Sequence, residues 1–224
     1  MIDSSTLQFL QELNKNNHKE WFSDHRKWYD TSRENFIEFC DTLLTDLKTI
    51  QADLQNTQVK NCILRINRDI RFSKNKDPYK NYFAAGFGPG GRTSGRVDFY
   101  LQIQPDNSFL GAGMWQPSPK NLALFRQEID YNPQELKGII YDPKFTAYFP
   151  EIHGEVLKTK PKGYDIDHPD IELLKRKELF FSHSYTDKEV ISKNFNQSVF
   201  EGCTIIKPYQ DYLNHLFYDT DEDN

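Results

Sequence analysis

The sequence predicts an α+β fold, with a central, mainly antiparallel sheet flanked by N-terminal and C-terminal helices. Near both ends of the chain, in 4–50 and 205–217, apolar residues recur every three to four positions, as on amphipathic helices. In 97–103, between these ends, apolar and polar residues alternate with a period of two, which is typical of a half-buried strand. The helical and strand patterns are grouped along the chain, so α+β is favoured over alternating βαβ units.

The first fifty residues are expected to be helical. Ser4 and Ser5 supply an N-cap, leucines recur every three residues after them, and Asn16 with Asn17 marks an end. From 20 to 50 an aromatic-rich apolar face predicts one or two helices, with a break near 30–32.

Strands are expected in the middle of the chain. Alternation in 62–67 predicts a strand with Arg65 and Asn67 on one face. The alternating segment 97–103 is followed by a turn at 105–108 and a second run at 109–115, which predicts a hairpin. The glycine-rich run 86–95 is expected to form a flexible loop or hairpin tip.

The remaining segments are predicted to be mainly helical. Proline starts and helical spacing predict helices at 119–131 and 133–141. A short turn is expected at 145–150, then a helix at 171–176 and a strand at 179–182. A helix at 205–217 ends the pattern.

Length and composition favour one domain over 1–224. It has a helical part at 1–50, a strand-rich part at 61–115 and a mixed part at 116–218 that ends in a helix. No stretch approaches the roughly 18 apolar residues that span a bilayer, and the start does not resemble a signal peptide. A cytoplasmic protein without a membrane partner is therefore expected.

Cys40, Cys62 and Cys203 are odd in number and far apart, so they are expected to be small buried residues rather than disulfides.

Charge is concentrated in the segment 65–80, which carries six cations and two carboxylates in a chain of net charge −5. Dense positive charge repels itself unless an anion compensates it, so the segment predicts an anion site. Guanidinium groups bind carboxylate or phosphate with two parallel hydrogen bonds, while lysines act as point charges. The predicted ligand-binding residues are Arg65, Arg68, Arg71, Lys76, Tyr79 and Lys80. The acidic remainder of the chain makes nucleic acid an unfavourable partner.

A second cluster, 165–168, brings two carboxylates and an imidazole within four residues. Asp167 and His168, together with Asp69, are the predicted catalytic residues. The alternative is that Asp167 and His168 form a turn before Pro169. The spacing matches no metal motif, and the glycine run matches no nucleotide-binding motif, so neither a metal nor a particular cofactor is predicted.

Three hypotheses follow. In the first, the protein is a hydrolase or transferase acting on a small molecule that bears a phosphate or carboxylate. The arginines hold the anion, Asp69 or Asp167 transfers protons, and Tyr79 positions the substrate. In the second, the same cations bind an anionic metabolite or an acidic partner segment without catalysis. In the third, Arg65, Arg68, Asp69 and Arg71 form a structural network of buried ion pairs that locks the strand to the helices. The sequence leaves these three open, and it does not indicate the oligomeric state.

The pattern R-x-x-R-D-x-R-F followed by N/D-K-x-x-Y occurs at 65–72 and 75–79. It resembles the signature of bacterial and fungal conserved hypothetical proteins known as domain of unknown function 2461. Asn16-Asn17 leading to Trp21-Phe22, and 161–164 leading to 167–169, also look like this family. The resemblance implies a single-domain protein and brings no activity, substrate or cofactor with it. The run around Gly88–Gly91 is longer and richer in glycine than the family pattern.

Overall fold

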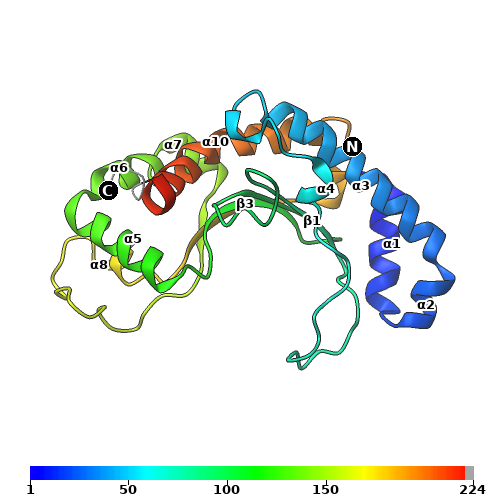
Figure 1. The fold of residues 1–224 in the computed structure, drawn as a ribbon, viewed down its shortest axis with the longest axis horizontal. Coiled ribbons are helices and arrows are strands. Elements are labelled where there is room, and N and C mark those ends of the chain that lie inside the picture. The colour runs from blue at the N-terminus through cyan, green and yellow to red at the C-terminus, as the bar shows by residue number, and fades with distance from the viewer. Residues whose placement is uncertain (220–224) are drawn as a thin grey trace. The chain divides into compact units, whose positions relative to one another are not determined.

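The computed structural model describes residues 1–219 and confirms the α+β class (Figure 1). Five strands form one sheet in the order β1-β2-β3-β5-β4. The chain groups into two compact units. Unit 1 comprises Met1–Gly95, Phe99–Leu110 and Ser184–Cys203, and unit 2 comprises Arg96–Asp98, Gly111–His183 and the described part of Thr204–Asn224. The organisation as a single domain stays a prediction.

Unit 1 holds the N-terminal helices and the first two strands. Its elements are α1 (Ser4–Lys15), α2 (Lys19–Asp24), α3 (Arg26–Leu47), the 3₁₀ turn η1 (Ala52–Leu54), α4 (Val59–Cys62), β1 (Phe83–Phe87), β2 (Phe99–Ile103) and α9 (Asp187–Val190). Three elements have residues in both units: β3 (Ser108–Met114), β5 (Leu179–Tyr185) and α10 (Phe195–Asn214). Unit 2 adds α5 (Pro119–Tyr131), α6 (Pro133–Ile140), α7 (Pro143–Tyr148), β4 (Glu151–His153), α8 (Ile171–Leu174) and the π-helical turn η2 (His215–Asp219).

The N-terminal helices form as predicted, but the break between the second and third helix lies elsewhere. It falls at His25, between α2 and α3, and not near 30–32. His25 bonds the carbonyl of Trp21 through its ring nitrogen Nδ1 at 2.8 Å and stacks on the Trp21 ring. The break keeps Phe22 and Tyr29 on the buried side, with ring centroids 4.9 Å apart.

An aromatic cluster holds the helices of unit 1 on β1. Phe9 of α1 is fully buried and lies within 6.5 Å, ring centroid to centroid, of the rings of Trp21, Phe22, Trp28, Tyr29 and Phe83. Phe36 of α3 stacks on Phe83 at 5.5 Å. Such contacts contribute dispersion energy beyond the apolar area that they bury. The cluster fixes α2 and the start of α3 against the strand.

The predicted hairpin at 97–115 is confirmed as β2 and β3, but two other expectations were wrong. The segment 62–67 forms no continuous strand: α4 ends at Cys62, and only isolated bridges follow, Ile63 with Ala85 and Asn67 with Tyr79. The expected turn at 145–150 is largely the helix α7, which Asp142 caps through bonds from the backbone N–H groups of Lys144 and Phe145.

The helix predicted at 205–217 begins earlier, at Phe195, as α10, and Pro208 lies inside it. The ring of Tyr209 is fully buried, and its hydroxyl donates to the carbonyl of Leu179 at 2.7 Å. Strand β4 pairs with β5 in antiparallel register, Glu151 opposite Ser182. These contacts join α10 and β4 to the same strand, β5.

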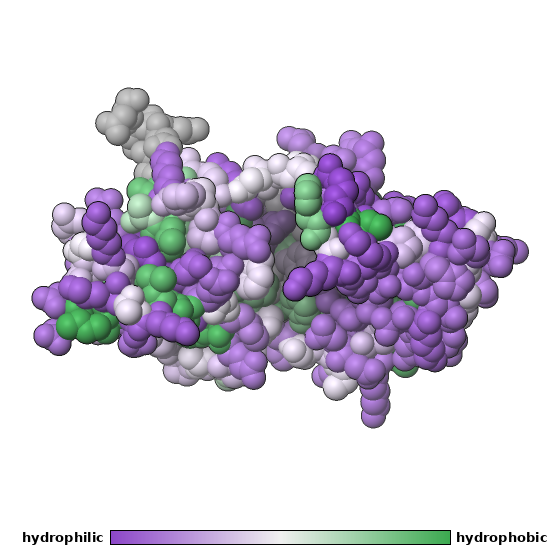
Figure 2. Space-filling view, turned by 90° about the horizontal axis from the view of Figure 1, so that it is seen from below, coloured by the Kyte–Doolittle hydropathy of each residue, from purple (hydrophilic) through white to green (hydrophobic). Residues whose placement is uncertain are grey.

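Hydrophilic residues dominate the face of the molecule seen in Figure 2. Within residues 1–219, no helix combines the length and apolar character that crossing a membrane requires. The three cysteines are buried, as expected. Burial raises the pKa of the Cys40 thiol, which keeps it protonated and unreactive.

Candidate functional site

The basic segment folds as a hairpin-like loop in unit 1. Asn67 and Tyr79 form an antiparallel bridge, and backbone bonds join Arg68 to Pro78 at 2.9 Å and Lys80 to Ile66 at 2.8 Å. Residues 68–78, named the basic loop from here on, project from this bridge and form the teal loop of Figure 1. Two bridge residues thus hold both ends of the loop.

Several cations of the basic loop are bonded to the loop itself. Arg68 donates from its two Nη atoms to the carbonyl of Asp77 at 3.1 Å and to the Ser73 hydroxyl at 3.3 Å. The Lys76 ammonium donates to the carbonyl of Ile70 at 3.0 Å. These bonds satisfy backbone groups that no sheet ladder pairs, so Arg68 and Lys76 brace the loop.

Asp69 and Arg71 form an ion pair at the surface. Their closest atoms, Oδ2 and Nη2, are 2.7 Å apart, and the side chains are 45% and 75% exposed. Hydrogen bonds from the Arg71 side chain and backbone lower the pKa of the Asp69 carboxyl. Exposed pairs contribute little to stability, and a lowered pKa makes Asp69 a weaker base.

Tyr79 is fixed from two sides by the α1–α2 region. The side-chain amide of Asn17 donates to the Tyr79 carbonyl at 3.0 Å and accepts from the Tyr79 N–H at 3.1 Å. The Phe22 ring stacks on the Tyr79 ring, with centroids 4.0 Å apart and planes 15° apart. Asn17 therefore pairs with the loop as a neighbouring strand would.

Asn17→Ala is expected to lower the free energy of unfolding by about 1–3 kcal/mol, because it leaves the backbone N–H and C=O of Tyr79 without their partner. Hydrogen exchange at the Tyr79 amide should become faster. Asn16→Ala is the matched control, because the Asn16 side chain bonds only the carbonyl of Glu12 among the described residues. Equal exchange rates at Tyr79 in wild type and Asn17→Ala would contradict this account.

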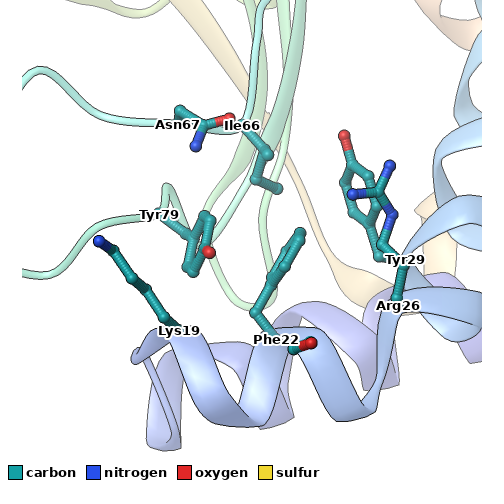
Figure 3. A pocket seen from close by; sticks show the side chains of 8 residues that line it. Lys19, Phe22, Arg26, Tyr29, Ile66, Asn67 and Tyr79 are labelled. Carbon is teal, nitrogen blue, oxygen red and sulfur yellow. The ribbon is translucent and has the colours of Figure 1, made fainter.

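The first cavity lies between the helices and the bridge (Figure 3). It has a volume of about 360 Å³ and is named the helix-face cavity. Its lining residues are Lys19, Phe22, Ser23, Arg26, Tyr29, Ile66, Asn67 and Tyr79. The members from α2 and α3 are spaced three or four residues apart and thus share one helical face.

Two cations stand on opposite sides of Phe22 in this cavity (Figure 3). Among residues 1–219, the Lys19 ammonium makes no hydrogen bond or ion pair, although its charge acts on the neighbouring Glu20 carboxylate. Arg26 donates from Nε to both oxygens of Asp30, at 3.0 and 3.1 Å, and its guanidinium carbon lies 5.3 Å from the centre of the Tyr29 ring. No residue that lines the cavity is acidic.

Burial raises the pKa of the Tyr29 hydroxyl, although the neighbouring Arg33 and Arg26 act in the opposite direction. Tyr29 therefore stays protonated near neutral pH and can donate a hydrogen bond. Ser23 and the Asn67 amide are further donors on the cavity wall. The cavity combines positive charge with hydrogen-bond donors, a combination that suits an oxyanion.

The second cavity lies along the basic loop, has a volume of about 500 Å³ and is named the loop cavity. Its lining residues are Asn14, Asn17, Arg68, Asp69, Asn75, Asp77, Tyr79, Lys80, Asn81 and Tyr82. Two cations and two carboxylates give this lining no net charge. Tyr79 lines both cavities.

Lys80 has an unusual electrostatic environment at the edge of the loop cavity. Its side chain is half-buried, and its ammonium donates to the carbonyl of Arg65 at 2.7 Å. Burial, followed by the positive charges of Arg65 and Arg92, lowers the pKa of Lys80. The protonated form of Lys80 is thus less stable, relative to its neutral form, than in a lysine exposed to water.

Arg92, one of the two cations that act on Lys80, belongs to the glycine-rich run. The Arg92 N–H and Nη1 both donate to the carbonyl of Asn61, at 3.2 and 2.9 Å. Gly91 has φ +105°, and a Cβ there would lie 2.5 Å from the Asn61 carbonyl oxygen. Only glycine allows this close approach, so the run is tied to the segment before the basic loop.

Asp167 and His168 belong to unit 2, whereas Arg65, Asp69 and the rest of the basic segment belong to unit 1. The His168 ring accepts at Nδ1 from the Asp170 N–H at 3.0 Å, and its Nε2 lies 3.2 Å from the Asp130 carboxylate. The Asp167 N–H donates to the Asp165 side chain at 3.3 Å, as in an Asx turn. The turn alternative thus matches the local bonding, and the catalytic roles of Asp167 and His168 stay predictions.

A family profile with the description conserved hypothetical protein (DUF2461) matches residues 5–212. The chain belongs to this family. Neither a curated protein nor a solved structure matches the chain. The matched region of the DUF2461 chain includes all residues of both cavities, and it includes the three stretches whose resemblance to the family was noted.

Lys19 and Arg26 of this DUF2461 member are not among the site residues predicted from the sequence. The available signal was the spacing of Lys19, Phe22, Arg26 and Tyr29 along one helical face. That face was interpreted only through its apolar members. The partner of the face, the Asn67–Tyr79 bridge, is more than forty residues away in sequence, so no local pattern connects them.

Proposed function

We propose that unit 1 binds a small phosphate- or carboxylate-bearing molecule in the helix-face cavity. The observation that carries the proposal is that Lys19 and Arg26 line this cavity and that no acidic residue does. Lys19 has no ion-pair partner among the described residues. Arg26 is paired with Asp30 through Nε, but its Nη groups make no hydrogen bond within residues 1–219. Both side chains can therefore donate charge-assisted hydrogen bonds to an oxyanion.

In this proposal the binding cations come from the helices and not from the arginines of the basic loop. Arg68 is engaged with Asp77 and Ser73, and Arg71 is engaged with Asp69. The loop would then act as a braced support that holds Asn67 and Tyr79 at the cavity wall. This assigns part of the basic segment to structure, as the third sequence hypothesis does.

The aromatic side chains of the cavity suggest a ligand with a flat apolar part. Phe22 lies between two other rings: it stacks on Tyr79, and it contacts Tyr29 with the ring planes tilted by 50°. Because Phe22 and Tyr29 are already buried, they offer edges rather than wide surfaces. The charges of Lys19 and Arg26 should therefore supply most of the binding affinity. The aromatic rings should determine which ligand shapes fit the cavity.

Catalysis of hydrolase or transferase type is the second candidate function. It is favoured by the loop cavity, where Arg68 and the carboxylates of Asp69 and Asp77 line one space. Turnover of a bound ligand, lost in Asp77→Asn but retained in Lys19→Ala, would support catalysis there. Binding without turnover of any such compound would favour the binding module.

Phenyl phosphate is a suitable probe for the helix-face cavity, and isothermal titration measures its affinity. Lys19→Ala and Arg26→Ala should each weaken binding about 10- to 100-fold, because each removes a charged hydrogen-bond donor. Lys27→Ala is the matched control, since Lys27 is exposed on the same helix and does not line the cavity. It should bind the probe as wild type does.

Two results would contradict the proposal. One is the absence of binding by phenyl phosphate, benzoate and inorganic phosphate alike. The other is loss of binding in Arg71→Ala together with unchanged binding in Lys19→Ala. That result would show that the anion binds at the basic loop.

A further inference from the structure

We propose that Lys80 is a nucleophilic amine that condenses with a small aldehyde or ketone in the loop cavity. This activity is distinct from anion binding in the helix-face cavity and does not depend on it. The chemical class of the substrate is a carbonyl compound that also bears a phosphate or carboxylate.

The position of Lys80 meets the geometric requirement. Its backbone N–H is bonded to Ile66, so the residue is held directly beside the Asn67–Tyr79 bridge. Its side chain lines a cavity of about 500 Å³, which holds a molecule of several carbon atoms. The Nζ atom lies 5.9 Å from the centre of the Tyr82 ring, another wall of the same cavity.

Neighbouring cations favour the neutral, nucleophilic form of this amine. Lysines become nucleophilic near neutral pH when they are desolvated or adjacent to another cation. Lys80 meets both conditions, because it is half-buried and has Arg65 and Arg92 as neighbours. The two cavity carboxylates do not cancel the effect: among the described residues, neither Asp69 nor Asp77 forms an ion pair with Lys80, and Asp69 is paired with Arg71.

The hydrogen bond of Lys80 is compatible with attack on a carbonyl group. A neutral amine has two N–H groups and one lone pair. One N–H donates to the Arg65 carbonyl at 2.7 Å, which orients the nitrogen and leaves the lone pair for the substrate. Lys74 and Lys76 differ from Lys80, because both are exposed to solvent and neither lines the loop cavity.

The reaction is balanced without a further reactant. The amine nitrogen forms a bond with the carbonyl carbon while one N–H proton is transferred to the carbonyl oxygen, which gives a carbinolamine. The C–O bond then breaks, the oxygen takes up a second proton and leaves as water, and the nitrogen loses its remaining N–H proton to give the imine. Burial raises the pKa of the Tyr82 hydroxyl, so Tyr82 remains protonated and is suited to donate a proton to the departing oxygen.

Other groups in the cavity indicate the rest of the substrate. Arg68 provides a guanidinium for an anionic group, although two of its nitrogens are already bonded within the loop. The amides of Asn14, Asn75 and Asn81 suit hydroxyl groups. A short hydroxy-aldehyde phosphate fits this combination of charge and polarity.

Trapping the imine tests the proposal directly. Wild-type protein is incubated with glycolaldehyde phosphate and cyanoborohydride, and the reduced adduct is located by peptide mass spectrometry. Modification of Lys80 is expected to be on the order of tenfold faster than that of Lys74 and Lys76 on the same loop. Lys80→Arg should remove this fast adduct and leave the slower ones unchanged.

The two proposals fail separately. Lys19→Ala should leave the modification of Lys80 unchanged, and Lys80→Arg should leave the affinity for phenyl phosphate unchanged. Equal modification of Lys74, Lys76 and Lys80 in the wild-type protein would overturn the inference, and so would an unmodified Lys80. Because these outcomes are read within the wild-type chain, they do not depend on how well a variant folds.

Discussion

Phe9→Ala is expected to lower the free energy of unfolding by about 3–5 kcal/mol, the usual cost of truncating a fully buried phenylalanine. The ring of Phe9 is inaccessible to solvent and contacts five other aromatic rings, including Phe22 and Phe83. Its removal would leave a cavity at the point where α1, α2 and β1 meet. Urea denaturation of wild type and variant measures the difference.

Phe72→Ala is the matched control for this prediction, because the same atoms are removed from a side chain that is 94% exposed at the tip of the basic loop. Its effect should stay within about 0.5 kcal/mol. A Phe9→Ala protein as stable as the Phe72→Ala protein would show that the aromatic cluster does not organise unit 1.

Asp98→Asn is expected to stabilise the protein more at pH 8 than at pH 5. Burial raises the pKa of the Asp98 carboxyl to about 7, and the hydrogen bond from its own backbone amide offsets this only in part. Because the folded pKa exceeds the unfolded value of about 3.9, the unfolded state ionises first as pH rises. The resulting loss of stability grows from about pH 4 and is complete above pH 7.

The size of this effect follows from the same shift. Three pKa units correspond to about 4 kcal/mol as an upper limit, of which about 2–3 kcal/mol should develop between pH 5 and pH 8. The gain in unfolding free energy from Asp98→Asn should therefore differ between the two pH values by that amount. Carboxyls with lowered pKa values, such as that of Asp69, alter the unfolding free energy of wild type and of Asp98→Asn equally. Their contributions therefore cancel in the difference between the two proteins. An equal gain at both pH values would contradict the burial of Asp98.

The hairpin of β2 and β3 was predictable because apolar and polar residues alternate in 97–103, although β2 is buried at most of its positions. Strand β1 was not, because Phe83–Phe87 is buried at every position and shows no alternation. The segment after Cys62 alternates as a strand does, yet it forms only isolated bridges. Alternation of residue types thus predicted β2, whereas it was absent from β1, whose residues are all apolar or glycine, and it was misleading after Cys62, where strand pairing stops early.

The candidate site was predictable only in part, for a related reason. The density of charge identified the basic segment, and Tyr79 and Lys80 do line cavities. Charge alone does not distinguish a cation that braces a loop from one that faces a ligand. Arg68 and Lys76 use their donors on backbone carbonyls of the loop, and such bonds depend on a chain conformation that residue types do not reveal.

A crystal structure of the protein with tungstate, a strongly scattering analogue of phosphate, tests the central claim most directly. The account predicts an anomalous density peak in the helix-face cavity, within hydrogen-bonding distance of the Lys19 ammonium and the Arg26 guanidinium. A peak held by Arg65, Arg68 and Arg71, with the helix-face cavity empty, would contradict it.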